Sequence, residues 1–437
     1  MHRYRQLIIT SFFLVFYLTV KAQFLMDMVD TSKSMGRGIF DIYNRYNNFY
    51  ISGYIQPQFQ FAESKGINSY SGGNFDSLSD NRFSVRRGRI RMDYIKTNED
   101  KMPKIHFVLQ YDITERGAFV RDFWGRIFDT KYNLFSLTAG LFARPFGYEV
   151  NLGSADRESP ERGRMSQSLM KVERDLGVMV SIDSRNKMSK LYFIKFDIGV
   201  FNGNGIASLS NGTPVTEYDS QKDIIGRLGI KQKAIIKNLY ISGGVSGLYG
   251  GISGKSNYYY LMDKDANGVN YFRKDSSTIN IRPKQYYGFD FQMKYNYNWG
   301  SSEFRVEYWN GVQTSLSNSN ETPSIIPTSP MYSRNFEGGF IYFLQHIVNR
   351  KHQLGIKYDW YDPNTNVAGS DIGKTGSNLS IYDIKYTTIG IGYINYFDPN
   401  VKLVLWYDWV KNENTNISGY TSDLKDNVIT CRLQYRF

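Results

Sequence analysis

The chain has 437 residues, of which 16% are aromatic and 39 are glycine, and its formal net charge is +12. Beyond the N-terminal region no stretch holds the roughly 20 consecutive apolar residues of a membrane-spanning helix. The single cysteine, Cys431, excludes an internal disulfide framework and a cysteine-based zinc site. Frequent aromatic residues and glycine are typical of a transmembrane β-barrel. The basic charge allows nucleic acid, an anionic membrane surface or small anions as partners.

The first 22 residues have the layout of a secretory signal peptide. Arg3 and Arg5 form a basic start, an apolar run extends from Leu7 to Val20, and Ala22 ends the segment before polar sequence. An N-terminal anchor helix is the alternative, but an apolar run of about 14 residues is short for it. We therefore expect cleavage after Ala22 and export, which argues against nucleic acid as a partner.

Residues 23–48 show no strand pattern, and we expect an N-terminal periplasmic arm with a short amphipathic helix. From residue 49 to residue 437 apolar and polar residues alternate with period two, as they do when one strand face meets lipid and the other meets water. Most of the alternating segments have the roughly 9 to 11 residues of a tilted spanning strand. The sixteen expected strands are 49–61, 83–95, 105–113, 119–128, 134–144, 176–182, 191–201, 221–231, 239–249, 286–297, 302–310, 335–345, 351–361, 386–396, 401–409 and 427–437.

The gaps between these segments alternate in length. Short polar turns such as 398–400 follow the even-numbered segments, and long stretches such as 145–175 and 250–285 follow the odd-numbered ones, with the short gap 114–118 as the exception. Outer-membrane barrels have short periplasmic turns and long external loops, whereas a soluble β-sandwich has no reason to sort loop lengths in this way. The pattern predicts an all-β fold: a single transmembrane antiparallel β-barrel of about 16 strands over 49–437, with both ends in the periplasm.

The last segment ends on an aromatic residue, Phe437. Counting back from it, Tyr435 and Ile429 belong to an apolar face, and Arg436 and Arg432 belong to a polar one. Such an ending resembles the C-terminal signal by which outer-membrane barrels are handed to their insertion machinery. We therefore expect this machinery as a partner that binds through Phe437.

The second segment carries three arginines on its polar face. Arg87, Arg89 and Arg91 alternate with apolar residues such as Ile90. Because a basic side chain at the bilayer midplane costs about 2 to 4 kcal/mol, the arginines are expected to line the lumen. There, guanidinium groups at successive heights of about 6 to 7 Å could bind oxyanions and pass them along. The alternative is an electrostatic scaffold, in which lumen acids pair with the arginines and nothing is selected.

Basic residues exceed acidic ones at the other expected lumen positions, and such a lumen raises the local concentration of anions. We assign Arg144 and Arg227 to the same anion pathway. The gap from 145 to 175 is expected to fold inward as a constriction loop in which Arg157, Arg162 and Arg164 touch solute. This gap carries a similar number of acidic residues, so a transverse field or a self-paired, rigid loop fits as well as an anion site.

Metal and catalytic sites are not indicated. Asp263–Gly268 matches the start of a calcium loop, but Lys274 stands where a bidentate carboxylate belongs. A turn at an external loop tip is therefore favoured, and calcium binding stays open. No nucleophile, base and orienting group converge on one strand end, so neither an enzyme nor a cofactor is expected.

Five motifs, in order along most of the mature chain, resemble the phosphate-selective porin O and P family: Gly53–Gln58, Arg86–Arg91, Ala139–Glu149, Glu173–Gly177 and Val200–Gly205. The resemblance implies a trimeric, anion-selective channel of sixteen strands with an arginine ladder, for which Arg87, Arg89 and Arg91 are the matching positions. The acid-rich mixture between Glu149 and Asp175 departs from a dedicated phosphate trap. Anions in general are therefore expected, with phosphate or similar oxyanions favoured.

The sequence thus predicts a porin in the outer membrane of a Gram-negative bacterium, through which small solutes diffuse passively. The alternatives are a structural barrel or adhesin that acts through its external loops and, less favoured, an outer-membrane enzyme. An adhesin or a scaffold is expected to fill or neutralise its lumen, so the charges inside the barrel distinguish the classes. The expected partners are small anions, outer-membrane lipid and lipopolysaccharide, the insertion machinery and two further copies in a homotrimer.

Overall fold

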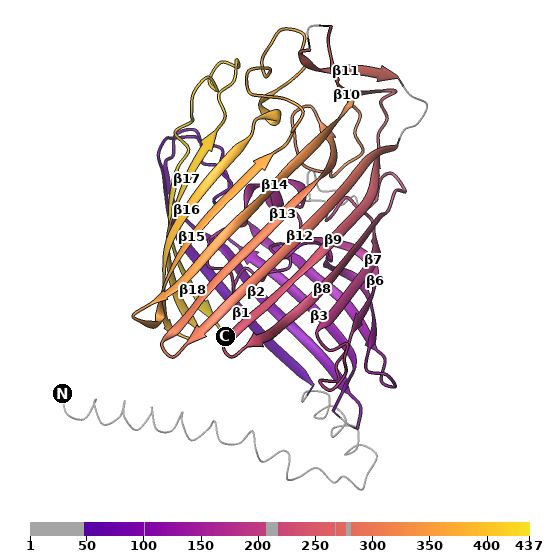
Figure 1. Cartoon of the computed structure of the whole chain (residues 1–437), viewed down its shortest axis with the longest axis vertical. Helices are drawn as coiled ribbons and strands as arrows, with labels where there is room; N and C mark the ends of the chain where they lie inside the picture. The colour runs from indigo at the N-terminus through magenta and orange to yellow at the C-terminus, as the bar shows by residue number, and fades with distance from the viewer. Residues whose placement is uncertain (1–47, 100, 207–216, 267, 277–280) are drawn as a thin grey trace, which may run out of the picture. The chain divides into compact units, whose positions relative to one another are not determined.

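The computed structural model describes residues 48–99, 101–206, 217–266, 268–276 and 281–437. The expected signal peptide, 1–22, and all but the last residue of the expected arm, 23–48, lie outside these residues. Residues Ile51–Phe437 form a unit of their own. In this unit, oblique antiparallel strands close into a barrel (Figure 1).

Sixteen strands form the wall in chain order, and the ring closes where β1 pairs with β18, for example at Phe59 and Cys431. The wall strands are β1 (Phe49–Ala62), β2 (Asn81–Thr97), β3 (Pro103–Thr114), β4 (Gly117–Phe128), β5 (Phe135–Ala143), β6 (Arg174–Asp183), β7 (Ile194–Phe201), β8 (Asp223–Ile236), β9 (Leu239–Ser253), β12 (Ile281–Tyr297), β13 (Gly300–Leu316), β14 (Met331–Ile347), β15 (Asn349–Asp362), β16 (Tyr386–Asp398), β17 (Val401–Asn412) and β18 (Val428–Arg436). Each predicted segment coincides with one of them, which confirms the predicted fold class and strand number.

A hairpin of two further strands, β10 (Tyr258–Lys264) and β11 (Asn270–Ser276), lies outside the ring. The two strands pair with each other, and β10 also makes a short parallel contact with β14. The sequence prediction placed both in a loop, because strands outside the membrane lack the lipid-facing alternation that identifies wall strands. The described helices are α4 (Arg164–Leu169) and the 3₁₀ turn η2 (Ile381–Asp383). Among the described residues, no helix is both long and apolar enough to cross a membrane.

The outward face of the wall is apolar and the inward face is polar. On β18, Ile429 is 50% exposed, whereas Arg432 is 3% exposed. On β12, which pairs with β9 and β13, Tyr287 and Phe289 are exposed, whereas Asp290 is buried. Period-two alternation therefore directs one residue set toward lipid and the other into the barrel, as the sequence predicted.

The connections at the two ends of the barrel differ in length, as expected. Short turns, such as 298–299 between β12 and β13, lie at the end where Phe437 lies, and long loops such as 363–385 lie at the other end (Figure 1). The turn at 115–116 between β3 and β4 is short at the long-loop end, which is the exception that the sequence also showed.

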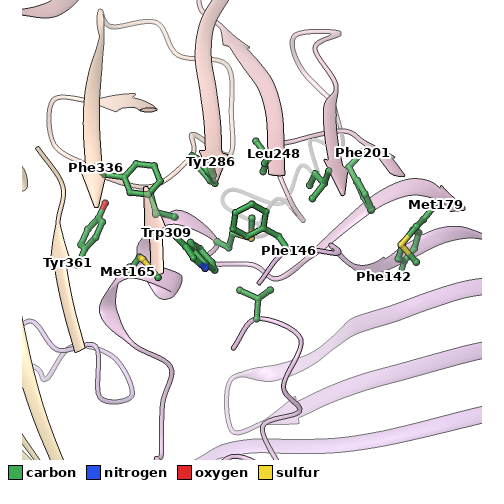
Figure 2. Packing of buried hydrophobic residues seen from close by; sticks show 14 residues of the cluster. Phe142, Phe146, Met165, Met179, Phe201, Leu248, Tyr286, Trp309, Phe336 and Tyr361 are labelled. Carbon is green, nitrogen blue, oxygen red and sulfur yellow. The ribbon is translucent and has the colours of Figure 1, made fainter. Parts of the chain in front are cut away.

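An apolar cluster fills part of the barrel interior, where the connection between β5 and β6 packs on the wall. We call this connection, residues 144–173, the lumenal loop. Its Phe146 and Met165 lie among the wall residues Tyr286, Trp309 and Phe336 (Figure 2), and the rings of Phe146 and Trp309 meet edge to face at 4.8 Å. This part of the lumen wall is aromatic because the inward loop needs an apolar surface against which to pack.

Candidate functional site: the lumenal loop and the outer cavity

The root of the lumenal loop is held by Glu307 of β13. The Glu307 carboxylate accepts hydrogen bonds from the backbone N–H of Tyr148 at 2.9 Å, from that of Glu149 at 2.7 Å, and from Trp309 Nε1 at 2.7 Å. Gly147 has a φ of 64°, and a side chain there would collide with Glu307. The loop therefore enters the barrel in one fixed direction.

Acidic residues of the lumenal loop form ion pairs with basic residues on wall strands far from β5. Glu149 pairs with Lys357 of β15 at 2.6 Å, and Glu158 pairs with Arg305 of β13 at 2.8 Å. Glu161 reaches further round the ring, to strands β2 and β18. Since the loop starts at β5, these ion pairs place it across the lumen, and its role as a constriction stays a prediction.

Glu161 is surrounded by three arginines. Its carboxylate lies 2.9 Å from Arg86, 2.7 Å from Arg87 and 2.7 Å from Arg432. Burial alone would raise the pKa of Glu161, but the three guanidinium groups hold it well below its usual range. One carboxylate facing three guanidinium groups leaves an excess of positive charge at this point.

The three arginines of the predicted ladder lie on the lumen side of β2, and each has a carboxylate partner. Arg87 pairs with Glu161, Arg89 Nε lies 3.1 Å from Asp112, and Arg91 Nε lies 2.8 Å from Asp93. These contacts are those of the electrostatic scaffold that the sequence left open. The role of the three arginines in conduction therefore stays a prediction.

Two of the three arginines expected in the constriction loop stabilise the loop itself. Arg157 donates to the carbonyl of Leu152 at 3.2 Å. Arg162 donates to the carbonyls of Ser166 at 3.2 Å and Met170 at 3.1 Å, at the C-terminal end of α4. Both guanidinium groups therefore donate to backbone carbonyls within the lumenal loop.

The two remaining residues expected in the anion pathway, Arg144 and Arg227, make polar contacts with groups other than Glu158 and Glu161. Arg144 donates to the carbonyl of Val172 and so joins the two ends of the loop. Arg227 of β8 pairs with Asp290 of β12 at 2.7 Å. Neither of them, nor Arg91, belongs to the lining of the cavity described next.

A cavity of about 990 Å³, here called the outer cavity, lies on the external side of the lumenal loop. Its lining includes Arg87, Arg89, Arg162 and Arg164 of the expected site. Ten basic side chains line it: Lys65, Arg86, Arg87, Arg89, Arg116, Arg121, Arg162, Arg164, Lys171 and Lys425. Five acidic side chains line it: Asp112, Glu161, Glu173, Glu321 and Asp426. The outer cavity is therefore positive.

An inner cavity of about 420 Å³ lies on the periplasmic side of the same loop. Glu158 lines this inner cavity, whereas Glu161, three residues along the loop, lines the outer one. The inner lining has Asp156, Glu158 and Glu303 against Lys294 and Arg305. The loop thus separates two polar cavities whose charge balance differs.

Three arginines of the outer cavity, Arg86, Arg116 and Arg121, were not among the site residues predicted from the sequence. Strict alternation assigns Arg86 to the lipid face, yet it reaches Glu161. On β4, Asp122 and Val120 pair with consecutive residues of β3, so Arg121 is the extra residue of a bulge. The bulge allows Arg121 to pair with Glu173 at 3.0 Å. Period two alone does not reveal a bulge.

In the segment for which the sequence favoured a turn, Asp263 lies near the end of β10, and Asp265 and Gly268 lie between β10 and β11. The backbone N–H of Gly268 donates to the carbonyl of Asp265 at 2.9 Å, and the Asp263 carboxylate lies 3.0 Å from Arg273. Within the described ranges, no group of three or more His, Cys, Asp or Glu side chains is placed to hold a metal ion.

Comparisons with known proteins identify the fold. No protein-family model matches the sequence, and no curated protein matches it either. The high-pH structure of Pseudomonas putida OprB matches 92% of this chain and 96% of its own, with 10% identity and a TM-score of 0.57. The outer membrane channel DcaP of Acinetobacter baumannii matches 89% of this chain and 97% of its own, with 11% identity and a TM-score of 0.54.

OmpT, an outer membrane protein of Vibrio cholerae solved in a trimer form, matches 89% of this chain and 99% of its own, with 12% identity and a TM-score of 0.50. At identities this low, the structural matches show the fold alone. The resemblance to the phosphate-selective porins therefore stays a prediction. The chain therefore has the fold of these outer-membrane β-barrels, with an apolar face directed outward.

Proposed function

We propose that the chain is a porin, an aqueous channel through which small solutes diffuse passively across the outer membrane of a Gram-negative bacterium. The lumenal loop is the observation that carries this proposal. It is tied to the far wall by ion pairs, and it has an outer cavity of about 990 Å³ on one side and an inner cavity of about 420 Å³ on the other. A loop held across the lumen between two polar cavities suits a constriction better than it suits a scaffold, an adhesin or an enzyme.

The proposed channel prefers anions. The twofold excess of basic over acidic side chains in the outer cavity supports this preference, because a positive lumen concentrates anions. Phosphate or similar oxyanions are favoured, since guanidinium groups bind them in a bidentate manner. The proposed anion pathway comprises Arg87, Arg89, Arg91, Arg144 and Arg227, with Arg157, Arg162 and Arg164 in the constriction loop. Their carboxylate and carbonyl partners make the preference moderate.

The proposed assembly is a homotrimer in contact with outer-membrane lipid and lipopolysaccharide. The trimer form of Vibrio cholerae OmpT, which shares the fold, supports this state. Gly243 and Gly247 of β9 belong to the outward residue set, like the exposed Val245 between them, and let a neighbouring barrel approach closely. We propose that insertion of each barrel depends on Phe437.

Removal of the constriction tests the proposal. Replacing residues 150–161 with a short Gly-Ser linker should raise the single-channel conductance in a planar bilayer severalfold, because the lumenal loop then no longer crosses the pore. Removal of the β10–β11 hairpin, which lies outside the ring, should leave the conductance unchanged and serves as the control. A barrel that conducts neither with nor without the lumenal loop would exclude a porin.

A further inference from the structure

The lining of the outer cavity has two chemically different parts. The part from β2 and β4 is cationic and includes Arg86, Arg89 and Arg121. The part from β15, β16 and the external loops is aromatic and contains five tyrosines: Tyr70, Tyr361, Tyr382, Tyr386 and Tyr420. A small inorganic anion uses only the first part. An anion that carries a ring can use both.

Arg164 lies where the cationic and aromatic parts meet. Its guanidinium carbon is 4.4 Å from the ring centre of Tyr70 and 3.6 Å from that of Tyr386. We call these three residues the arginine clamp. A guanidinium between two aromatic faces keeps its planar orientation and directs its N–H groups sideways.

The Arg164 side chain differs from the other arginines of this cavity in its partners. Arg87 pairs with Glu161, and Arg162 lies 3.5 Å from Glu173. Among the described residues, no carboxylate forms an ion pair with Arg164, and its buried Nε has no hydrogen-bond partner. The contact with Asp359 involves only the backbone N–H of Arg164, at 3.4 Å. The Arg164 guanidinium can therefore accept a carboxylate from solution.

We propose that the arginine clamp binds aromatic carboxylates that enter the channel from outside. The carboxylate of the solute takes charge-assisted hydrogen bonds from Arg164, and its ring stacks on Tyr382 and Tyr420, which also line the cavity. A cavity of about 990 Å³ has room for such a solute. The inference rests on the proposed porin function, since the clamp is reached through an open channel.

Block of the chloride current in a planar bilayer tests this inference. Benzoate, cyclohexanecarboxylate and inorganic phosphate are added in turn to the external side, and the concentration that halves the current is measured. Cyclohexanecarboxylate has the charge and nearly the shape of benzoate but no aromatic ring. We expect benzoate to halve the current at a concentration roughly tenfold lower, because only benzoate stacks on tyrosine.

Two variants separate the contribution of the Arg164 charge from that of the tyrosine rings on which the solute stacks. Arg164→Gln should weaken block by both carboxylates, and the double variant Tyr382→Leu/Tyr420→Leu should remove only the advantage of benzoate. Arg185→Gln is the matched control, because Arg185 also lies over a ring, that of Phe128 at 5.1 Å, but at a periplasmic turn. Each variant is first checked for heat-modifiable migration on a gel, which reports a folded barrel.

The outcomes separate this inference from the porin proposal. A wild-type channel that conducts chloride but is blocked equally by benzoate and cyclohexanecarboxylate overturns the inference and leaves the porin standing. Retention of the benzoate advantage in the folded Tyr382→Leu/Tyr420→Leu variant, or of full block by both carboxylates in folded Arg164→Gln, overturns it as well. A wild-type barrel without chloride conductance overturns the porin proposal and the inference with it.

Discussion

Glu161 shows how a single carboxylate can both hold the constriction and limit the charge of the pore. It pairs with Arg86 and Arg87 of β2 and with Arg432 of β18, so it joins the loop to two strands while offsetting part of their charge. Removing one partner from a buried ion pair costs about 3 to 5 kcal/mol, because the other charge remains buried. Stability and selectivity therefore depend on the same side chain.

Glu161→Gln is expected to lower the temperature of barrel unfolding and to raise anion selectivity, because three guanidinium groups lose their counter-charge. Unfolding is followed by heat-modifiable migration, and selectivity by the reversal potential. Glu217→Gln is the control: Glu217 pairs with Lys222 outside the barrel lumen, where an exposed pair contributes up to about 1 kcal/mol. An unfolding temperature and a reversal potential that both stay at their wild-type values would contradict this role of Glu161.

Asp426 makes the outer cavity sensitive to pH. It lies in the external loop after β17, and burial raises the pKa of its carboxyl to about 6, while Arg164 acts to lower it. Above that pH the carboxylate offsets part of the charge of Arg164, and below it the neutral carboxyl does not. Anion selectivity should therefore increase when the pH is lowered from about 7.5 to about 5. Asp426→Asn should hold the higher selectivity at both pH values, and a variant with the full pH response of the wild type would refute the assignment.

At the scale of the single strand, β2 tests the assignment of faces. Arg89 is 6% exposed and lies on the lumen side, whereas Ile90 is 36% exposed and faces outward. Ile90→Arg should reduce the amount of folded barrel in the outer-membrane fraction, since a basic residue at the midplane costs about 2 to 4 kcal/mol. Arg89→Gln should still assemble, because Gln keeps a polar group beside Asp112, and should lower anion selectivity. Normal assembly of Ile90→Arg together with failed assembly of Arg89→Gln would show that the lumen and lipid faces of β2 are assigned the wrong way round.

The wall strands could be predicted from the sequence because lipid imposes a strict alternation on each of them. The final strand is the clearest case, since Ile429 and Tyr435 are exposed while Arg432 and Gln434 are buried, as the pattern required. The β10–β11 hairpin escaped prediction because no bilayer constrains its faces. Arg121 escaped because one extra residue in β4 changes which side chains face the lumen.

The candidate site could be predicted only in part, because its contacts join residues that are far apart in the chain. The sequence indicated an inward loop with Arg157, Arg162 and Arg164. It could not indicate that Glu158 meets Arg305, 147 residues away. The pairing of loop acids with wall arginines depends on how the ring closes, and the alternation of one strand does not contain that information.

At the scale of the whole molecule, the proposed assembly is a homotrimer. Crosslinking and light scattering of the full chain in mild detergent should give three copies, because the small outward residues of β9 permit close contact between barrels. Replacing Gly247 with Trp should shift the population toward the monomer while the barrel still folds. A wild-type chain that is monomeric by both methods would refute the trimer.

The reversal potential of the wild-type channel tests the central claim most directly. A planar bilayer separates two potassium chloride solutions of different concentration, and the voltage at zero current reports which ion crosses more easily. The excess of basic side chains in the outer cavity predicts a reversal potential displaced from zero toward the equilibrium potential of chloride. A reversal potential of zero, or one displaced toward the equilibrium potential of potassium, would contradict an anion-selective porin.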